Sequence, residues 1–164
     1  VQRVLAACSD RLRVHAAPSA STNDALANKA PESDSGETGV DTDCKFCLNR
    51  EKWMDQELGS VWAHADGYPV SAGHHLIIPK RHAADLFAMT TGERQDADAM
   101  IFRLREQLMA NDPTIEGFNV GMNCGAQAGQ SIFHAHWHLI PRRQGDSRAK
   151  KGGVRGVIPE KMEY

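Results

Sequence analysis

Three histidines occupy alternate positions of one apolar segment. His134, His136 and His138 lie within residues 131–140, and the residues between them are hydrophobic. Side chains of a β-strand alternate between its two faces, so this spacing predicts a strand that presents all three imidazoles on one face. An imidazole can bind a metal ion, accept a proton or attack as a nucleophile, so this face is the candidate site. The residues expected on the opposite, buried face are Phe133, Ala135, Trp137 and Leu139.

The distance between histidines on a strand argues against one metal ion held by all three. Neighbouring side chains on one face start about 6.6 Å apart, whereas zinc needs ligand nitrogens at about 2.0–2.1 Å. Two adjacent histidines could converge on one ion, but three on a straight strand could hardly do so. A division of roles is therefore expected. The central His136, flanked by two groups that can fix its tautomer, suits a nucleophile or a base.

A pair of cysteines, Cys44 and Cys47, is separated by two residues. A redox role would need a preceding strand and a helix dipole that lowers a thiol pKa, yet a polar, charged segment precedes the pair. A zinc site would need two more ligands. Unbound thiols packed under the domain are the third possibility. Cys8 and Cys124 stand apart, so we expect no disulfide scaffold and a reducing, cytoplasmic compartment.

The strands and helices expected around these residues indicate an α+β domain with a mainly antiparallel sheet. A strand is expected over residues 74–78, and a short helix begins near His82. Apolar and polar residues alternate over 118–122, as in a half-buried strand. A glycine-rich turn over 125–129 then leads into the histidine strand, which Pro141 is expected to close.

One long helix is predicted after residue 90. Thr90 and Glu93 match a capping box, in which a hydroxyl and a carboxylate bond the first backbone donors of a helix. Asn111-Asp112-Pro113 is expected to end this helix. The apolar residues at helical spacing between these signals are Ala97, Ile101, Leu104 and Leu108.

The composition narrows the classes of partner. The 164 residues carry 19 basic and 21 acidic side chains, a net charge of −2, which gives no extended positive surface for nucleic acid. No run of about 18 apolar residues is present, so no membrane span is expected. Residues 1–43 contain no aromatic residue and are rich in small, polar and acidic residues. They are expected to be a disordered or misassigned N-terminal extension.

Three stretches of the chain carry motifs that form a recognisable set. Residues 134–140 follow the pattern H-φ-H-φ-H-φ-φ, in which φ is apolar. Residues 123–131 contain N-x-G followed by G-Q-S, and residues 66–82 contain D-x-x-P followed by G-H-x-L-I-I-P-K-x-H. In this order the motifs resemble those of the histidine triad (HIT) family of nucleotide-binding proteins.

The resemblance implies a HIT-like fold, with an antiparallel sheet of about five strands, one long helix and one short helix, normally in a homodimer. It assigns residues 44–143 to the domain and residues 144–164 to a C-terminal extension. This extension contains the apolar residues Val154, Val157 and Ile158. We therefore expect it to pack on the domain or on the dimer partner.

The resemblance also implies an activity. Family members cleave at the α-phosphorus of nucleoside phosphoramidates or of dinucleoside polyphosphates such as diadenosine tetraphosphate (Ap4A), through a covalent nucleotidyl-histidine. His136 would be the nucleophile, and His138, Gln130 and Ser131 would contact the phosphate or the leaving group. Asp66 would hold the ribose and Asn123 would orient the site. The residues expected to bind the purine nucleotide are Asp66, His74, Asn123, Gln130, Ser131 and His138.

For the metal, the resemblance implies that structural zinc is bound by the cysteine pair together with His82 and His134. His74 or His75 could replace His82 as a ligand. Two other functions remain open. The chain could be a purine-nucleotide-binding regulatory protein without catalytic activity, or a metal-dependent hydrolase in which the triad histidines are catalytic ligands.

Overall fold

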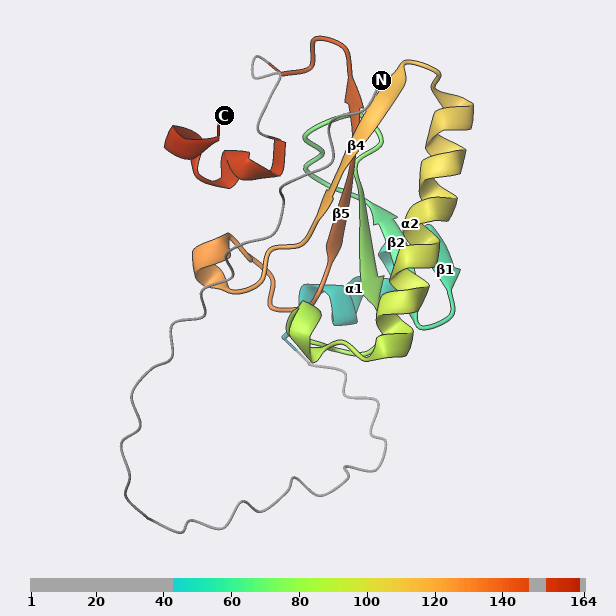
Figure 1. Cartoon of the computed structure of the whole chain (residues 1–164). Helices are drawn as coiled ribbons and strands as arrows, with labels where there is room; N and C mark the ends of the chain where they lie inside the picture. The colour runs from blue at the N-terminus through green and yellow to red at the C-terminus, as the bar shows by residue number, and fades with distance from the viewer. Residues whose placement is uncertain (1–42, 148–152, 163–164) are drawn as a thin grey trace, which may run out of the picture. The chain divides into compact units, whose positions relative to one another are not determined.

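The computed structural model describes residues 43–147 and 153–162, so the extension predicted over residues 1–43 lies, except for Asp43, outside the described residues. Five strands form one antiparallel sheet in the order β1-β2-β3-β5-β4 (Figure 1). The predicted α+β class and strand number are confirmed. The strands are β1 Gln56–Leu58, β2 Val61–Ala65, β3 His75–Pro79, β4 Ile115–Gly121 and β5 Trp137–Arg143.

Helix α2, Thr91–Asn111, confirms the long helix. The Thr90 hydroxyl accepts from the Glu93 backbone N–H, and the Glu93 carboxylate accepts from the Thr90 N–H, so the capping box forms as predicted. The buried apolar residues of α2 are Ala97, Met100 and Leu104, whereas the predicted Ile101 and Leu108 are half-buried. No helix in the described residues is long and apolar enough to cross a membrane.

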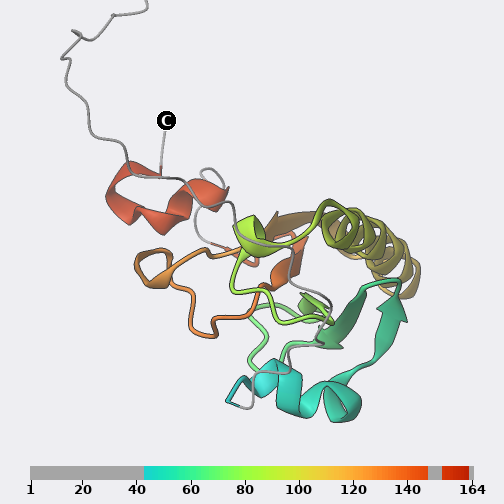
Figure 2. The same ribbon diagram turned by 90° about the horizontal axis from the view of Figure 1, so that it is seen from below.

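The two α-helices cover opposite faces of the sheet, as Figure 2 shows. Helix α2 packs on Val61, Ala63 and Ile77, while α1, Lys45–Trp53, brings Phe46 against residues of the other face. The short helix expected near His82 is instead a single 3-10 turn, η1 Leu86–Ala88. The short α-helix of this fold is therefore α1, which begins directly after Cys44.

The strand predicted over residues 131–140 is wrong in its first half. Strand β5 begins at Trp137, and residues 131–136 lie outside it, with bends at residues 132–134. The alternation therefore fails there, and Phe133, expected in the core, is 56% exposed. Pro141 lies inside β5 instead of closing it. Proline is tolerated because the pairing of β5 with β3 stops at Leu139, so a backbone donor is not needed on that side.

Candidate functional site

The register of the sheet places His138 on the face covered by α1. His138 lies opposite Leu76 of β3 on one side and Gly121 of β4 on the other. Leu139, its neighbour, belongs to the core under α2, so His138 points to the opposite face. A Cβ built on Gly121 would meet nothing within 4 Å, so the sheet is open beside His138 toward β4.

His136 lies just before β5 and is 5% exposed. Its Nδ1 donates to the backbone carbonyl of His134 at 2.7 Å. Burial lowers the pKa of His136, because a buried imidazolium loses its hydration. The hydrogen bond holds the proton on Nδ1 and leaves the lone pair on Nε2. This tautomer is the one that a nucleophile or a base requires.

A chain of side chains runs from Asp66 through His74 to His138. Asp66 Oδ2 lies 3.2 Å from His74 Nδ1, and His74 Nε2 lies 3.0 Å from His138 Nδ1. The His138 ring centroid lies 5.1 Å from that of His136. The pKa of His138 is lowered to about 4, mainly by burial and also by the neighbouring His136 and His74. The chain orients His138 beside His136 in its neutral form.

The loop before the triad is organised by Gln130, which is 5% exposed. Its amide donates to the carbonyls of Ala84 and Ile132, and its carbonyl accepts from the Gly125 N–H. Gln130 thus ties the glycine-rich turn to the loop after β3. Ser131 follows it on the surface, and Asn123 precedes the turn and lines a hollow with His138.

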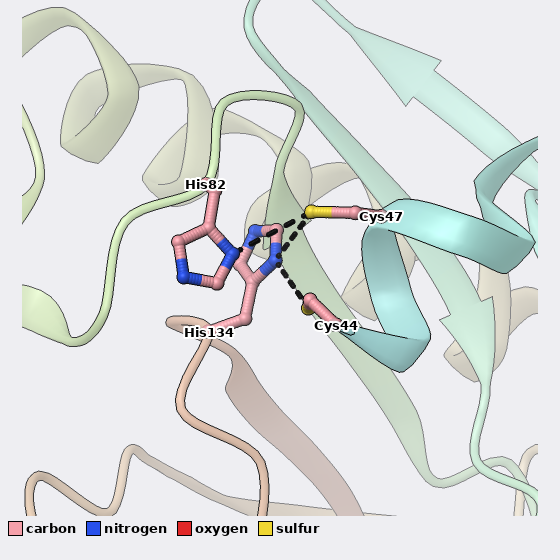
Figure 3. A group of neighbouring side chains, drawn as sticks. All are labelled: Cys44, Cys47, His82 and His134. Atoms are coloured by element: carbon pink, nitrogen blue, oxygen red, sulfur yellow. Dashed lines mark hydrogen bonds between the residues drawn. The ribbon is translucent and has the colours of Figure 1, made fainter. Parts of the chain in front are cut away.

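A second cluster joins Cys44, Cys47, His82 and His134, as predicted for zinc (Figure 3). The ligand atoms of the four residues all lie within 4.8 Å of one another. His134 Nδ1 lies 3.3 Å from Cys44 Sγ and 3.5 Å from Cys47 Sγ, and Cys47 Sγ lies 3.5 Å from His82 Nδ1. A tetrahedral zinc ion sets its sulfur and nitrogen ligands about 3.3–3.8 Å apart. The donor set and its spacing therefore fit zinc.

The surroundings of the second cluster also fit a metal site. Cys44 is the N-cap of α1 and Cys47 lies in its first turn, so both thiols face the same side. The other ring nitrogen of His134, Nε2, donates to the Pro79 carbonyl at 2.9 Å, which leaves Nδ1 as the acceptor that faces the thiols. His75 instead donates to the Gly73 carbonyl. Of the histidines considered for this position, the structure brings His82 to the cluster.

Phe46 is a site residue that the sequence analysis did not single out. Its ring packs edge-on against His134 and His136, with centroid distances of 5.8 and 5.3 Å. It is 3% exposed. Phe46 could have been predicted from its position between Cys44 and Cys47. A residue between two neighbouring cysteines must lie close to any site that the cysteines form.

Comparisons with known proteins agree with this geometry. The family model described as the HIT domain matches residues 54–145. An uncharacterized HIT-like protein of Borreliella burgdorferi is 34% identical over 116 residues, 68% of this chain and 84% of that protein. An AP-4-A phosphorylase of Mycobacterium tuberculosis is 35% identical over 53% of this chain and 45% of its own length. An adenosine 5'-monophosphoramidase of Candida albicans is 34% identical over 53% of this chain and 59% of its own length.

Solved structures are similar in the same region. A Zn-bound histidine triad family protein from Mycobacterium smegmatis superposes with a TM-score of 0.60 at 28% identity. The match covers 66% of this chain and 81% of that one. The similarity thus extends from sequence motifs to the arrangement of the sheet.

Proposed function

Because the chain belongs to the HIT family, we propose that it is a nucleotide hydrolase or transferase that cleaves at the α-phosphorus of its substrate. The family relatives support this class, since they include an AP-4-A phosphorylase and an adenosine 5'-monophosphoramidase. The proposed substrates are nucleoside phosphoramidates or dinucleoside polyphosphates. The observation that carries the proposal is the hydrogen bond from His136 Nδ1 to the His134 carbonyl.

The proposed reaction has two steps. In the first, Nε2 of His136 forms a bond to phosphorus while the bond to the leaving group breaks; the leaving group departs with the electron pair and takes up a proton where it is an amine. In the second, water attacks the same phosphorus, gives up a proton, and releases the nucleotide from His136. Splitting one displacement into two needs a group that both attacks and leaves readily, which imidazole provides.

The neighbouring groups receive roles in the same proposal. His138, held by His74 and Asp66, lies beside the reacting phosphate, and Asp66 also faces the ribose hydroxyls. Ser131 and the backbone donors of the glycine-rich turn would stabilise charge on the phosphoryl oxygens. Gln130 would act mainly by fixing that turn, because its amide already bonds three backbone groups. Asn123 would orient the bound nucleotide.

Zinc forms part of the proposal, with Cys44, Cys47, His82 and His134 as its ligands. A closed site of two cysteines and two histidines gives zinc a structural role, which is to hold separate chain segments together. The Zn-bound relative from Mycobacterium smegmatis supports this assignment. Thiolate ligands must remain reduced, so we place the protein in a reducing, cytoplasmic compartment.

A homodimer is proposed from the free side of β4. Among the described residues β4 pairs only with β5, so it is an edge of the sheet. Phe102 and Met109 on α2 and Val120 on β4 are 59%, 38% and 39% exposed around a hollow of about 350 Å³. An apolar edge of this kind favours pairing with a second copy. Phe102→Glu should halve the mass measured by sedimentation equilibrium; an unchanged mass would exclude this interface.

Trapping the covalent intermediate tests the proposed function. Purified protein is mixed with adenosine 5'-phosphoramidate or Ap4A, with EDTA to bind free divalent ions, and quenched at neutral or alkaline pH because phosphoramidates are acid-labile. We expect an adenylylated peptide that contains His136. His136→Asn should lose the adduct and at least about a thousandfold in kcat/KM.

The matched control is His75→Asn, which replaces a histidine on the other face of the sheet. It should keep turnover within about twofold, because surface and peripheral changes rarely exceed that effect. Full turnover by His136→Asn would refute the mechanism. Nucleotide binding without any turnover or adduct in the unchanged protein would favour the regulatory, non-catalytic function instead.

A further inference from the structure

The two thiols of the cysteine–histidine cluster lie together at the start of helix α1. Cys44 is the N-cap of this helix, and Cys47 lies in its first turn. Both side chains face His82 and His134, and their sulfur atoms lie within 4.8 Å of each other (Figure 3). Two cysteines separated by two residues at a helix N-terminus have the arrangement of dithiols that form reversible disulfides. The pair therefore has the geometry for oxidation as well as for metal binding.

A small pocket next to the cluster gives solutes access to one of the thiols. Its volume is about 270 Å³, and its lining includes Cys44 and His82 of the cluster together with Lys45 and Ser131. A water molecule takes about 30 Å³ of liquid volume, so a solute as small as hydrogen peroxide fits this pocket. Oxidation of a thiol depends on such access.

His134 connects the two thiols to the proposed nucleophile. Its Nδ1 lies 3.3 Å from Cys44 Sγ and 3.5 Å from Cys47 Sγ. Its backbone carbonyl accepts from Nδ1 of His136 at 2.7 Å. The same residue thus contacts the thiols through its ring and fixes the tautomer of His136 through its backbone. A rearrangement of the thiols reaches His136 through this one residue.

Phe46 provides a second connection, because it lies between the two cysteines in the chain. Its ring centroid lies 5.3 Å from that of His136. The same ring packs edge-on against Trp53 and Trp62, with centroid distances of 6.4 and 6.2 Å. A movement of the first turn of α1 would therefore displace a ring that packs on the proposed nucleophile. The two tryptophans would report this movement as a change in fluorescence.

Resting on the proposed zinc site and activity, we infer that Cys44 and Cys47 form an oxidation site, at which a peroxide joins the two thiols in a disulfide and thereby lowers turnover at His136. A disulfide sets its sulfur atoms about 2.05 Å apart, closer than two ligands of one zinc ion. The oxidised pair therefore no longer supplies two thiolates to the site. The ring of His134 loses its thiol partners in the same event.

The oxidation has two steps that balance. One thiol attacks an oxygen of hydrogen peroxide, the O–O bond breaks, and a sulfenic acid and water form. The second thiol then attacks the sulfenic sulfur, the S–S bond forms, and a second water leaves. Two thiols thus lose two electrons in total, and one peroxide is reduced to two waters. Where the pair starts as thiolates, the solvent supplies the two protons. A dithiol reductant reverses the disulfide by exchange.

Peroxide treatment of the zinc-loaded, full-length protein tests the inference. Cys8→Ser and Cys124→Ser are combined first, so that Cys44 and Cys47 are the only cysteines. We expect hydrogen peroxide to release zinc to a chromogenic chelator, to give a Cys44–Cys47 disulfide in the peptide map and to change the tryptophan fluorescence. Turnover of adenosine 5'-phosphoramidate should fall at least about tenfold, because a small misplacement of a reacting group has an effect of this size. Dithiothreitol with added zinc should restore both zinc content and turnover.

Three results would overturn the inference. The first is a pair that stays reduced with its zinc bound, and the second is a disulfide that forms without loss of turnover. The third is a loss of turnover that the reductant and zinc do not reverse. Protein that binds no zinc before treatment would overturn the inference together with the zinc site. Absence of turnover before treatment would overturn the proposed function, while the peptide map and the released zinc still decide whether the pair is an oxidation site.

A variant with one thiol separates disulfide formation from general oxidative damage. Cys47→His, made in the same background, keeps four potential zinc ligands but cannot form a disulfide within the chain. At the peroxide dose that inactivates its parent, it should lose less than about twofold of its own starting turnover. The parent with both thiols is the matched control. Equal fractional losses in the two proteins would refute the role of the disulfide.

Discussion

Two histidines that are two residues apart, His134 and His136, belong to different kinds of site. Both are almost fully buried, at 1% and 5% exposed, and both touch Phe46. His134 donates from Nε2 to the Pro79 carbonyl and turns Nδ1 to the thiols. His136 donates from Nδ1 to a neighbouring carbonyl and keeps the Nε2 lone pair for chemistry. The partner of one ring nitrogen thus decides what the other nitrogen can do.

The two clusters also differ in how they are enclosed. The cysteine–histidine cluster draws its members from segments 35 to 90 residues apart and brings the potential ligand atoms of all four residues within 4.8 Å of one another. The cluster around His138 is held by Asp66 and His74, and both His74 and His138 line an open pocket. A closed cluster suits a structural ion, and an open one suits a substrate.

Removing a thiol of the cysteine–histidine cluster should give the largest difference in effect between the two clusters. Cys44→Ser removes one of the four proposed zinc ligands, so we expect zinc content to fall from one ion per chain to none and the free energy of unfolding to fall by about 4 kcal/mol. Metal analysis and urea denaturation measure both quantities. Cys124→Ser, a half-buried cysteine outside the cluster, should change neither. Retention of zinc by Cys44→Ser would show that the cluster is not the metal site.

Loss of the positioning histidine should affect the other cluster alone. His74→Asn breaks the chain from Asp66 to His138, and we expect kcat to fall about 10- to 100-fold with little change in KM. Zinc content should remain that of the unchanged protein, because His74 is not among the four clustered residues. An equal fall in kcat for His75→Asn, or a loss of zinc in His74→Asn, would contradict the separation.

The smallest expected effect is on the pH dependence of stability. The pKa of His138 falls from 6.5 to about 4 on folding, so the unfolded chain binds more protons than the folded one between these pH values. Stability is therefore full above about pH 6.5 and declines as the pH falls toward 4. His138→Gln should make this decline shallower, while the buried His74 and His136 keep part of it. Urea denaturation at several pH values measures the slope; an unchanged slope would show that His138 is not the group responsible.

Local signals in the sequence predicted the parts of the fold that depend on near neighbours. The capping box of Thr90 and Glu93 starts α2, and Asp112 ends it. Each of these signals acts within about one turn of the helix, so the two ends of α2 are defined without tertiary contacts. Strand β3 was predicted within one residue at each end. Helix α1 and strands β1 and β2 were not identified from the residue pattern. Helix α1 is short, and its stability depends on the packing of Phe46 against the sheet.

The triad segment illustrates the limit of local pattern. Alternation predicted one straight strand over residues 131–140, yet the Ala135 N–H bonds the Ala83 carbonyl and Gln130 bonds Ala84, so the segment bends before β5. These partners lie about fifty residues away along the chain. The sequence pattern contains no information on them.

The sequence by itself determined the chemistry available to this protein: three alternating histidines, a cysteine pair, and motifs that place the chain in the HIT family. Tertiary structure decided how that chemistry is divided. Inserting β5 between β3 and β4 sets His134 against the cysteines and His138 beside His74, and it opens a pocket toward the C-terminal extension. The physical reason is that the partners of His134 and His138 and the walls of the pocket come from segments far apart in sequence, so only their packing fixes which groups meet.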